Sequence, residues 1–266
     1  MKLPIYQIDA FATQPFRGNP AAVVPLHAWL PDQLMRDIAA ENNLSETAFI
    51  VRDTVGTFQI RWFSPLKEID FCGHATLASA HVLFRLHPDL SVLTFSAAAV
   101  GTLTVTTLEN GHIEMSFPIR SLASVDAVPA SLLDGLSIRP TEVLKNQQAY
   151  VAVFENEMQV RSLVPNLQKL VELGPLDVAV TAPGLTHDFV SRYFWPANGG
   201  AEDPVTGSIH AGLAPFWATR LGKSSLTALQ ASARSGSLYC RVEGERVFVA
   251  GSAVQYMEGT IEVQGA

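Results

Sequence analysis

The chain has only two cysteines, Cys72 and Cys240, among its 266 residues. They lie far apart, and neither has a second cysteine close to it. Such spacing excludes a disulfide framework and a zinc site built from paired thiolates. We therefore expect neither a disulfide nor a bound metal.

Charge is scarce as well. Charged residues make up 16% of the chain, the formal net charge is −7, and no basic cluster occurs. Because this balance repels phosphate backbones, we expect no nucleic-acid partner. No run of about 18 uncharged apolar residues is present, and the first residues lack the long apolar stretch of a secretion signal. These absences favour a cytoplasmic protein without a membrane partner.

Common catalytic motifs are missing too. The chain has no G-x-G-x-x-G, no phosphate-binding P-loop and no H-E-x-x-H, and Gly207-Ser208 lacks the intervening residue of a G-x-S-x-G elbow. Nucleotide-dependent, zinc-dependent and serine-hydrolase chemistry are therefore not indicated.

What the chain does contain is an internal repeat. Three pairs of similar segments occur in the same order, between about 131 and 135 residues apart. They are Arg61–Pro65 with Arg192–Pro196, Cys72–His74 with Thr206–Ser208, and Gly101 with Gly236. Ordered anchors at a nearly constant offset indicate two tandem copies of one unit. We place the halves at residues 1–120 and 125–258, with a linker at Ser121–Pro129.

Hydrophobic periodicity predicts strands and a buried helix in each half, an α+β arrangement. The expected helices are Pro31–Asn42, Gly73–Leu86 and Gly207–Leu221, and the second has so little polar surface that the strands of its half should wrap around it. Strands are expected at Ile5–Phe11, Thr47–Arg52, Thr57–Phe63, Val92–Ser96, Thr102–Thr107, His112–Phe117, Val151–Phe154, Val178–Thr181, Phe189–Phe194, Leu226–Ala231, Leu238–Val242, Val247–Val249 and Thr260–Val263.

The helix starts at Gly73 and Gly207 suggest an anion site. If the two halves face each other, both helix N-termini direct unpaired N–H groups and partial positive charge at a shared cleft. Either glycine alone is better explained as relief of strain at a turn. Their equivalent positions in two copies favour the binding of a small carboxylate.

Several polar side chains accompany these helix starts. His74 follows Gly73 and is able to assist proton transfer, Asp203 precedes Gly207, and Glu46 lies between a helix and an apolar strand. Each has an ordinary alternative: a histidine bonded to a neighbouring carbonyl, a turn-capping aspartate, a solvated glutamate. His210, inside its helix, is expected to be structural. Cys72 is interpreted as a thiol lining the pocket or as a small hydrophobe in a tight turn.

Four motifs together resemble the phenazine-biosynthesis PhzF-like family. They are Phe16–Val24, Ser45–Phe49, Phe71–Thr76 and Glu202–Ser208. The resemblance implies a diaminopimelate epimerase-like fold, with two pseudo-symmetric halves that each curl a barrel-like sheet around a central helix. It also implies that the last strand, in residues 259–264, returns to the first half, and that the protein is a homodimer.

By the same resemblance the protein is a cofactor-independent isomerase in which Glu46 moves a proton within a small carboxylate substrate. His74 and Asp203 would hold or polarise the substrate together with Ser208. Two further groups have predicted binding roles. Gly73 and Gly207 would offer backbone N–H groups, and Asn19 and Ser45 belong to the substrate-binding set.

Two rival functions remain open. A two-base epimerase of this fold uses a cysteine at each central helix start, but the repeat counterpart of Cys72 is Thr206, a poor base. Glu46 nevertheless maps onto Asp177, so a pair of carboxylates is an alternative. The other rival is a non-catalytic binder of an anionic metabolite.

Overall fold

The computed structural model of the protein describes residues 1–264. The chain divides into two units, which are described separately. Unit 1 is Met1–Ser116 with the segment from Ala250 onward, and unit 2 is Phe117–Val249. Within residues 1–264, no helix is both long and apolar enough to cross a membrane.

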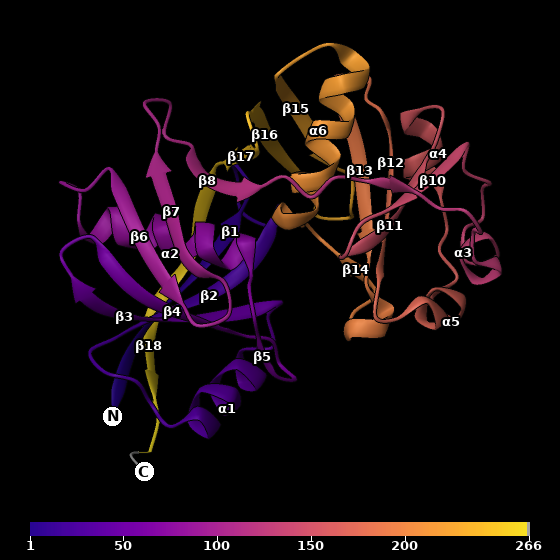
Figure 1. Ribbon diagram of the computed structural model, residues 1–266. Coiled ribbons are helices and arrows are strands. Elements are labelled where there is room, and N and C mark those ends of the chain that lie inside the picture. Colours follow the sequence, from indigo (N-terminus) through magenta and orange to yellow (C-terminus); the bar gives the residue numbers. More distant parts are fainter. Residues whose placement is uncertain (265–266) are drawn as a thin grey trace. The chain divides into compact units, whose positions relative to one another are not determined.

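Unit 1 is a curled sheet with a helix inside it (Figure 1). Its elements are β1 (Lys2–Ala10), β2 (Asn19–Leu26), α1 (Asp32–Asn42), β3 (Glu46–Thr54), β4 (Thr57–Phe63), β5 (Glu68–Ile69), α2 (Gly73–Leu86), β6 (Val92–Ala97), β7 (Gly101–Thr107), β8 (Ile113–Pro118) and β18 (Ala253–Glu262). The strands pair in the order β18-β1-β2-β3-β4-β6-β7-β8, and only β2/β3 and β4/β6 are parallel.

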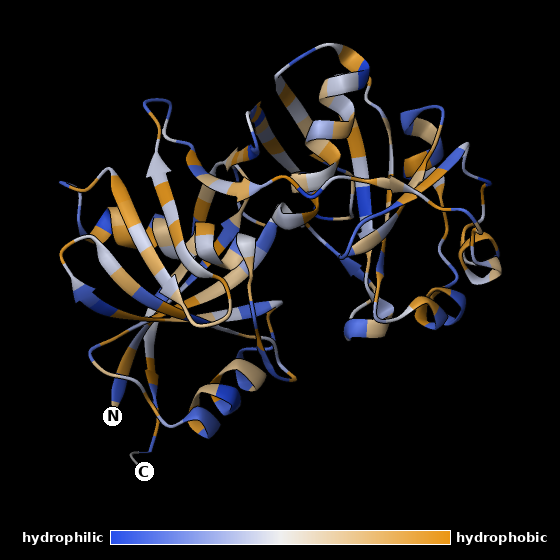
Figure 2. Cartoon of the chain, viewed as in Figure 1, coloured by the Kyte–Doolittle hydropathy of each residue, from blue (hydrophilic) through white to orange (hydrophobic). Residues whose placement is uncertain are grey.

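Helix α2 forms the centre of unit 1. It contacts β1, β2, β3, β7 and β18, and its residues from Gly73 to Ala80 are all buried. Helix α1, in contrast, buries only Met35, Ile38 and Ala39 and carries hydrophilic stripes on its remaining surface (Figure 2). The difference follows from composition, because α2 has apolar or small residues on every side whereas α1 has one apolar stripe.

Unit 2 repeats this strand scheme. Its elements are β9 (Ala123–Ser124), α3 (Ala130–Gly135), β10 (Glu142–Lys145), β11 (Ala149–Val153), α4 (Glu157–Ser162), α5 (Leu167–Leu170), η1 (Val171–Leu173), β12 (Asp177–Pro183), β13 (Phe189–Phe194), η2 (Pro196–Asn198), β14 (Glu202–Asp203), η3 (Gly207–Ile209), α6 (His210–Leu221), β15 (Ser225–Gln230), β16 (Gly236–Glu243) and β17 (Arg246–Gly251). The parallel pairs are β11/β12 and β13/β15, which correspond to β2/β3 and β4/β6.

An ion pair recurs at equivalent places in the two units. Arg61 on β4 donates two hydrogen bonds to Glu68 on β5, at 2.6 and 2.7 Å. Arg192 on β13 donates two to Glu202 on β14, at 2.8 and 2.9 Å. Each arginine also lies over the phenylalanine two residues further along its strand. A shared geometry of this detail supports an origin by duplication.

The structure differs from the sequence expectations at several elements. Strand β2 and the helices α3, α4 and α5 were not predicted, the segment expected to be a linker contains β9, and β18 begins earlier than expected. The helix expected from Gly207 begins with the 3₁₀ turn η3. Its cause is local: the Thr206 carbonyl accepts a hydrogen bond from His210 Nδ1 at 2.9 Å, while the His210 N–H bonds to the carbonyls of Gly207 and Ser208.

Candidate active site

Glu46 is positioned by the turn between α1 and β3. Asn43 ends α1 in the left-handed conformation, with φ 49°, and its N–H donates to the Ala39 carbonyl. Asparagine tolerates this conformation better than most residues. The Asn42 amide then donates to the Thr47 hydroxyl at 3.0 Å, which holds the start of β3. Glu46 is therefore the first strand residue and is only 7% exposed.

Asn19 is positioned by a second tight turn. Gly18 has φ +65°, and a Cβ built there would lie 2.1 Å from the Ala10 carbonyl oxygen, so only glycine fits. The turn places Asn19 opposite Ala10 at the start of β2, with its side chain completely buried. This is the structural reason for the Gly-Asn-Pro motif.

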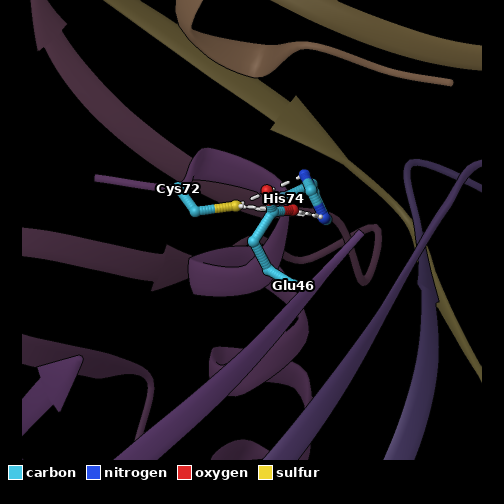
Figure 3. A group of neighbouring side chains, drawn as sticks. All are labelled: Glu46, Cys72 and His74. Atoms are coloured by element: carbon cyan, nitrogen blue, oxygen red, sulfur yellow. Dashed lines mark hydrogen bonds and ion pairs between the residues drawn. The ribbon is translucent and has the colours of Figure 1, made fainter. Parts of the chain in front are cut away.

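Three side chains of unit 1 converge at the start of α2 (Figure 3). His74 Nε2 lies 2.9 Å from Glu46 Oε2, and the Cys72 thiol donates to the same oxygen at 3.5 Å. Cys72 Sγ also lies 3.4 Å from His74 Nδ1. Cys72 and His74 are 6% and 5% exposed. The cluster is thus a nearly buried carboxylate held by a thiol and an imidazole.

The hydrogen bond from Asn19 determines the protonation of the imidazole. Asn19 Nδ2 lies 3.0 Å from His74 Nδ1. An amide nitrogen only donates, so Nδ1 is the acceptor and the ring proton resides on Nε2, where it faces Glu46. His74 is therefore neutral in this arrangement and donates to the Glu46 carboxylate.

The start of α2 adds backbone donors to this cluster. Cys72 is the N-cap residue, in an extended conformation without a side-chain cap hydrogen bond, and Gly73 is the first helical residue. In any α-helix the first N–H groups have no acceptor within the helix, and the helix dipole places partial positive charge there. The arrangement suits an anionic group beside a proton-transferring carboxylate.

In unit 2, Asp203 and Thr206 form the turn before η3. The Thr206 hydroxyl donates to Asp203 Oδ2. Gln230 braces the turn, because its amide nitrogen donates to the Asp203 carbonyl at 2.8 Å and its amide oxygen accepts from the Thr206 N–H at 2.8 Å. Asp203 is half-buried. Hydrogen bonds to Thr206 and Gln230 thus hold Asp203, one of the predicted site residues, in place.

Ser208 belongs to a hydrogen-bond network that the sequence did not reveal. Gln148 Nε2 donates to Ser208 Oγ at 2.8 Å and to the Tyr193 hydroxyl at 3.0 Å. The Tyr193 hydroxyl in turn donates to Asp177 Oδ2 at 2.7 Å. Gln148 lies just before β11, and no motif marks it. The one available signal was the correspondence of Asp177 with Glu46.

That correspondence is visible in the strand register. Glu46 opens β3 opposite Ala21 of the parallel strand β2, and Asp177 opens β12 opposite Ala149 of the parallel strand β11. Burial raises the pKa of Asp177, while the hydrogen bonds from Tyr193 and Asn198 oppose that shift. Burial, and then the charge of Asp177, raise the pKa of Tyr193. Asp177 is thus the structural counterpart of Glu46.

Of the other predicted site residues, Ser45 precedes Glu46 in the bend before β3, and Gly207 is buried at the first position of η3. His210 is completely buried, as a structural histidine should be. Burial lowers the pKa of His210 to about 4. Unit 1 therefore brings Asn19, Glu46 and His74 together with Cys72, whereas Asp203, Gly207 and Ser208 belong to unit 2.

The family model described as "Phenazine biosynthesis-like protein" matches residues 8–259. The chain belongs to the phenazine biosynthesis-like family. It is 49% identical over 264 residues to an uncharacterized isomerase of Pseudomonas aeruginosa, with 99% of this chain and 100% of the relative covered. A crystal structure of a phenazine biosynthesis protein of the PhzF family from Enterococcus faecalis matches with a TM-score of 0.94 and 40% identity, over 99% of this chain and 100% of the other.

More distant structures share the fold alone. A predicted epimerase from Pseudomonas aeruginosa matches with a TM-score of 0.73 at 22% identity, over 98% of this chain and 100% of the other. The phenazine biosynthesis-like chain therefore has the expected epimerase-like α+β fold.

Proposed function

We propose that the protein is a cofactor-independent isomerase that moves a proton within a small carboxylate substrate, with Glu46 as the general acid/base. The observation that supports this proposal most directly is the nearly buried Glu46 carboxylate. It accepts hydrogen bonds from His74 Nε2 at 2.9 Å and from the Cys72 thiol at 3.5 Å. The name of the Pseudomonas aeruginosa relative, an uncharacterized isomerase, supports the same class.

The chemistry begins when the Glu46 carboxylate removes a proton from a carbon of the substrate. Negative charge then develops on the substrate, and the N–H groups and dipole at the start of α2 stabilise it. Glu46, now a carboxylic acid, exchanges its proton with solvent and then donates a proton to another carbon. No proton is gained or lost overall. His74 holds the carboxylate oriented throughout, and Asn19 keeps the donating nitrogen of His74 towards it.

In unit 2, Asp203, Gly207 and Ser208 are proposed to bind the substrate. The support is the family resemblance of their motif together with the hydrogen bonds that fix Asp203 and Ser208. Ser45 and Gly73 are proposed binding residues of unit 1. A homodimer is also proposed on the resemblance, and sedimentation analysis of the purified protein tests it.

A second candidate function is a two-base epimerase. Its support is Asp177, which occupies the strand position equivalent to that of Glu46 and whose pKa is raised by burial. A two-base reaction requires one carboxylate and one carboxylic acid, and a raised pKa favours the acid form. Single enantiomers of amino or hydroxy acids in D₂O would then give inverted, labelled product, and Asp177→Asn would suppress it.

The experiment for the proposed function is a thermal-shift screen of small carboxylic acids, followed by proton NMR of each stabilising compound in D₂O with the wild-type protein. An isomerase exchanges a substrate proton for deuterium and converts the compound into a constitutional isomer. Stabilising ligands that never exchange would instead identify a non-catalytic binder.

A further inference from the structure

The Glu46, Cys72 and His74 side chains combine a carboxylate, a thiol and an imidazole, three ligand types that zinc accepts together. Their ligand atoms all lie within 4.8 Å of one another. Proton transfer by Glu46 explains the carboxylate and its hydrogen bond to His74. It assigns no step of the reaction to the Cys72 thiol, which contacts both Glu46 and His74.

The spacing of the three atoms fits a tetrahedral metal. Zinc lies about 2.3 Å from sulfur and about 2.0–2.1 Å from nitrogen or oxygen, so its ligand atoms are about 3.3–3.6 Å apart. Here Glu46 Oε2 is 3.5 Å from Cys72 Sγ, and His74 Nε2 is 3.9 Å from the sulfur and 2.9 Å from the oxygen. Shifts of about half an ångström would bring all three atoms to bonding distance of one ion.

We propose that Glu46, Cys72 and His74 form an inhibitory site for Zn²⁺ or a similar thiophilic divalent cation. Three protein ligands leave the fourth position to water, as in open zinc sites. Binding converts the Cys72 thiol to a thiolate and releases its proton to solvent. His74 stays neutral: its proton moves from Nε2 to Nδ1, where the Asn19 amide oxygen accepts it after the amide rotates.

The negative charges of the ligands favour a cation here, although the cluster lies at the positive end of helix α2. The positive end of the α2 dipole disfavours a cation at this position. The Cys72 thiolate and the Glu46 carboxylate supply two negative charges in direct contact with the metal, which outweighs that repulsion. A thiolate and an imidazole also select zinc over magnesium or calcium, which prefer oxygen ligands. Each of the three residues is 5–7% exposed.

The consequence is inhibition, because a carboxylate bound to zinc no longer accepts a proton from a substrate. Inhibition rests on the proposed function, but metal binding does not. A failure of the isomerase assignment would therefore leave the binding result intact, and the two are tested separately. The ion is an inhibitor here and supplies no step of the reaction.

The test is a titration of the metal-stripped full-length protein with Co²⁺, whose thiolate charge-transfer band reports sulfur ligation, and with Zn²⁺ by calorimetry. We expect one ion per chain. Cys72→Ser should abolish the band and weaken Zn²⁺ binding more than about a hundredfold, since loss of an outer-sphere partner alone costs 10–100-fold. Cys240→Ser is the matched control, because Cys240 is also a buried free cysteine and lies in unit 2. It should leave the band unchanged.

A second measurement needs no variant. Zn²⁺, but not Mg²⁺, should slow alkylation of Cys72 by iodoacetamide in the wild-type protein, as mapped by mass spectrometry. The proposal is overturned if no cobalt–thiolate band forms, if the band persists in Cys72→Ser, or if Zn²⁺ leaves the alkylation of Cys72 unchanged.

Discussion

His74 Nε2 lies 2.9 Å from Glu46 Oε2, and this contact joins the start of strand β3 to the start of helix α2. Two chain segments with unrelated local signals thus deliver one acid/base pair. Because Asn19 donates to the other nitrogen of the imidazole, the pair has a defined direction, with histidine as donor and carboxylate as acceptor.

The structure predicts which nitrogen of the neutral His74 ring carries the proton. Nitrogen NMR of the wild-type imidazole should show a neutral ring with the proton on Nε2 at pH 7. Asn19→Ala removes the donor to Nδ1 and should yield a mixture of tautomers, with a lower catalytic rate. A wild-type ring protonated on Nδ1 alone would contradict the assignment.

The buried His210 should make the stability of the folded protein depend on pH. Its pKa is about 4 in the folded protein, below the ordinary value of 6.5, because it is completely buried. The unfolded chain therefore binds more protons between these values, and stability falls as the pH drops through this window. Between pH 7 and pH 5 the loss from this residue should be about 2 kcal/mol.

The comparison is with His210→Gln, which cannot titrate and retains a donor for the Thr206 carbonyl. Its free energy of unfolding in urea should fall less over the same pH interval than that of the wild type. Equal losses in the two proteins would show that His210 does not carry this dependence.

The repeated ion pairs should differ in strength. Arg192 and Glu202 side chains are 12% and 24% exposed, against 24% and 37% for Arg61 and Glu68. Arg192→Gln leaves a largely buried carboxylate unpaired and should lower the free energy of unfolding by about 3 kcal/mol. Arg61→Gln should cost about 1 kcal/mol. Urea denaturation of both variants measures these losses. Equal losses in the free energy of unfolding would contradict the argument from burial.

Asp203→Asn tests the contribution of unit 2. The asparagine amide oxygen still accepts from the Thr206 hydroxyl, so the turn and the melting temperature should be retained. Solvent deuterium incorporation into the substrate should nevertheless fall by about a hundredfold, because a polarising carboxylate is lost. Unchanged incorporation would remove Asp203 from the proposed machinery.

The sequence predicted much of this fold because its strongest signals are local. The alternation in Thr57–Phe63 and the nearly continuous apolar character of Gly73–Leu86 gave two elements at their observed bounds. Strand β2 was missed since its proline-containing sequence reads as a motif rather than as an alternating strand. The prediction of an α-helix from Gly207 onward was wrong in its first turn, because the His210 side chain competes for the Thr206 backbone carbonyl.

For the candidate site, the limits were different. The motifs identified Glu46 and His74, but their 2.9 Å contact depends on the register of β2 with β3 and on the burial of α2. The place of Cys72 within this cluster was left open for the same reason. Gln148, which links Ser208 to Tyr193, has no local signal at all. Contacts between distant segments arise from tertiary packing, which residue spacing does not encode.

The central claim is that Glu46 transfers the proton, and Glu46→Gln tests it most directly. The glutamine amide oxygen still accepts from His74 Nε2, so ligand-induced thermal stabilisation should persist. Glu41→Gln, an exposed change on α1, is the matched control. In D₂O, proton NMR should show that the wild type and the control incorporate deuterium into a carboxylic acid that stabilises the protein. Glu46→Gln should incorporate none. Incorporation by Glu46→Gln at the wild-type rate would contradict the account.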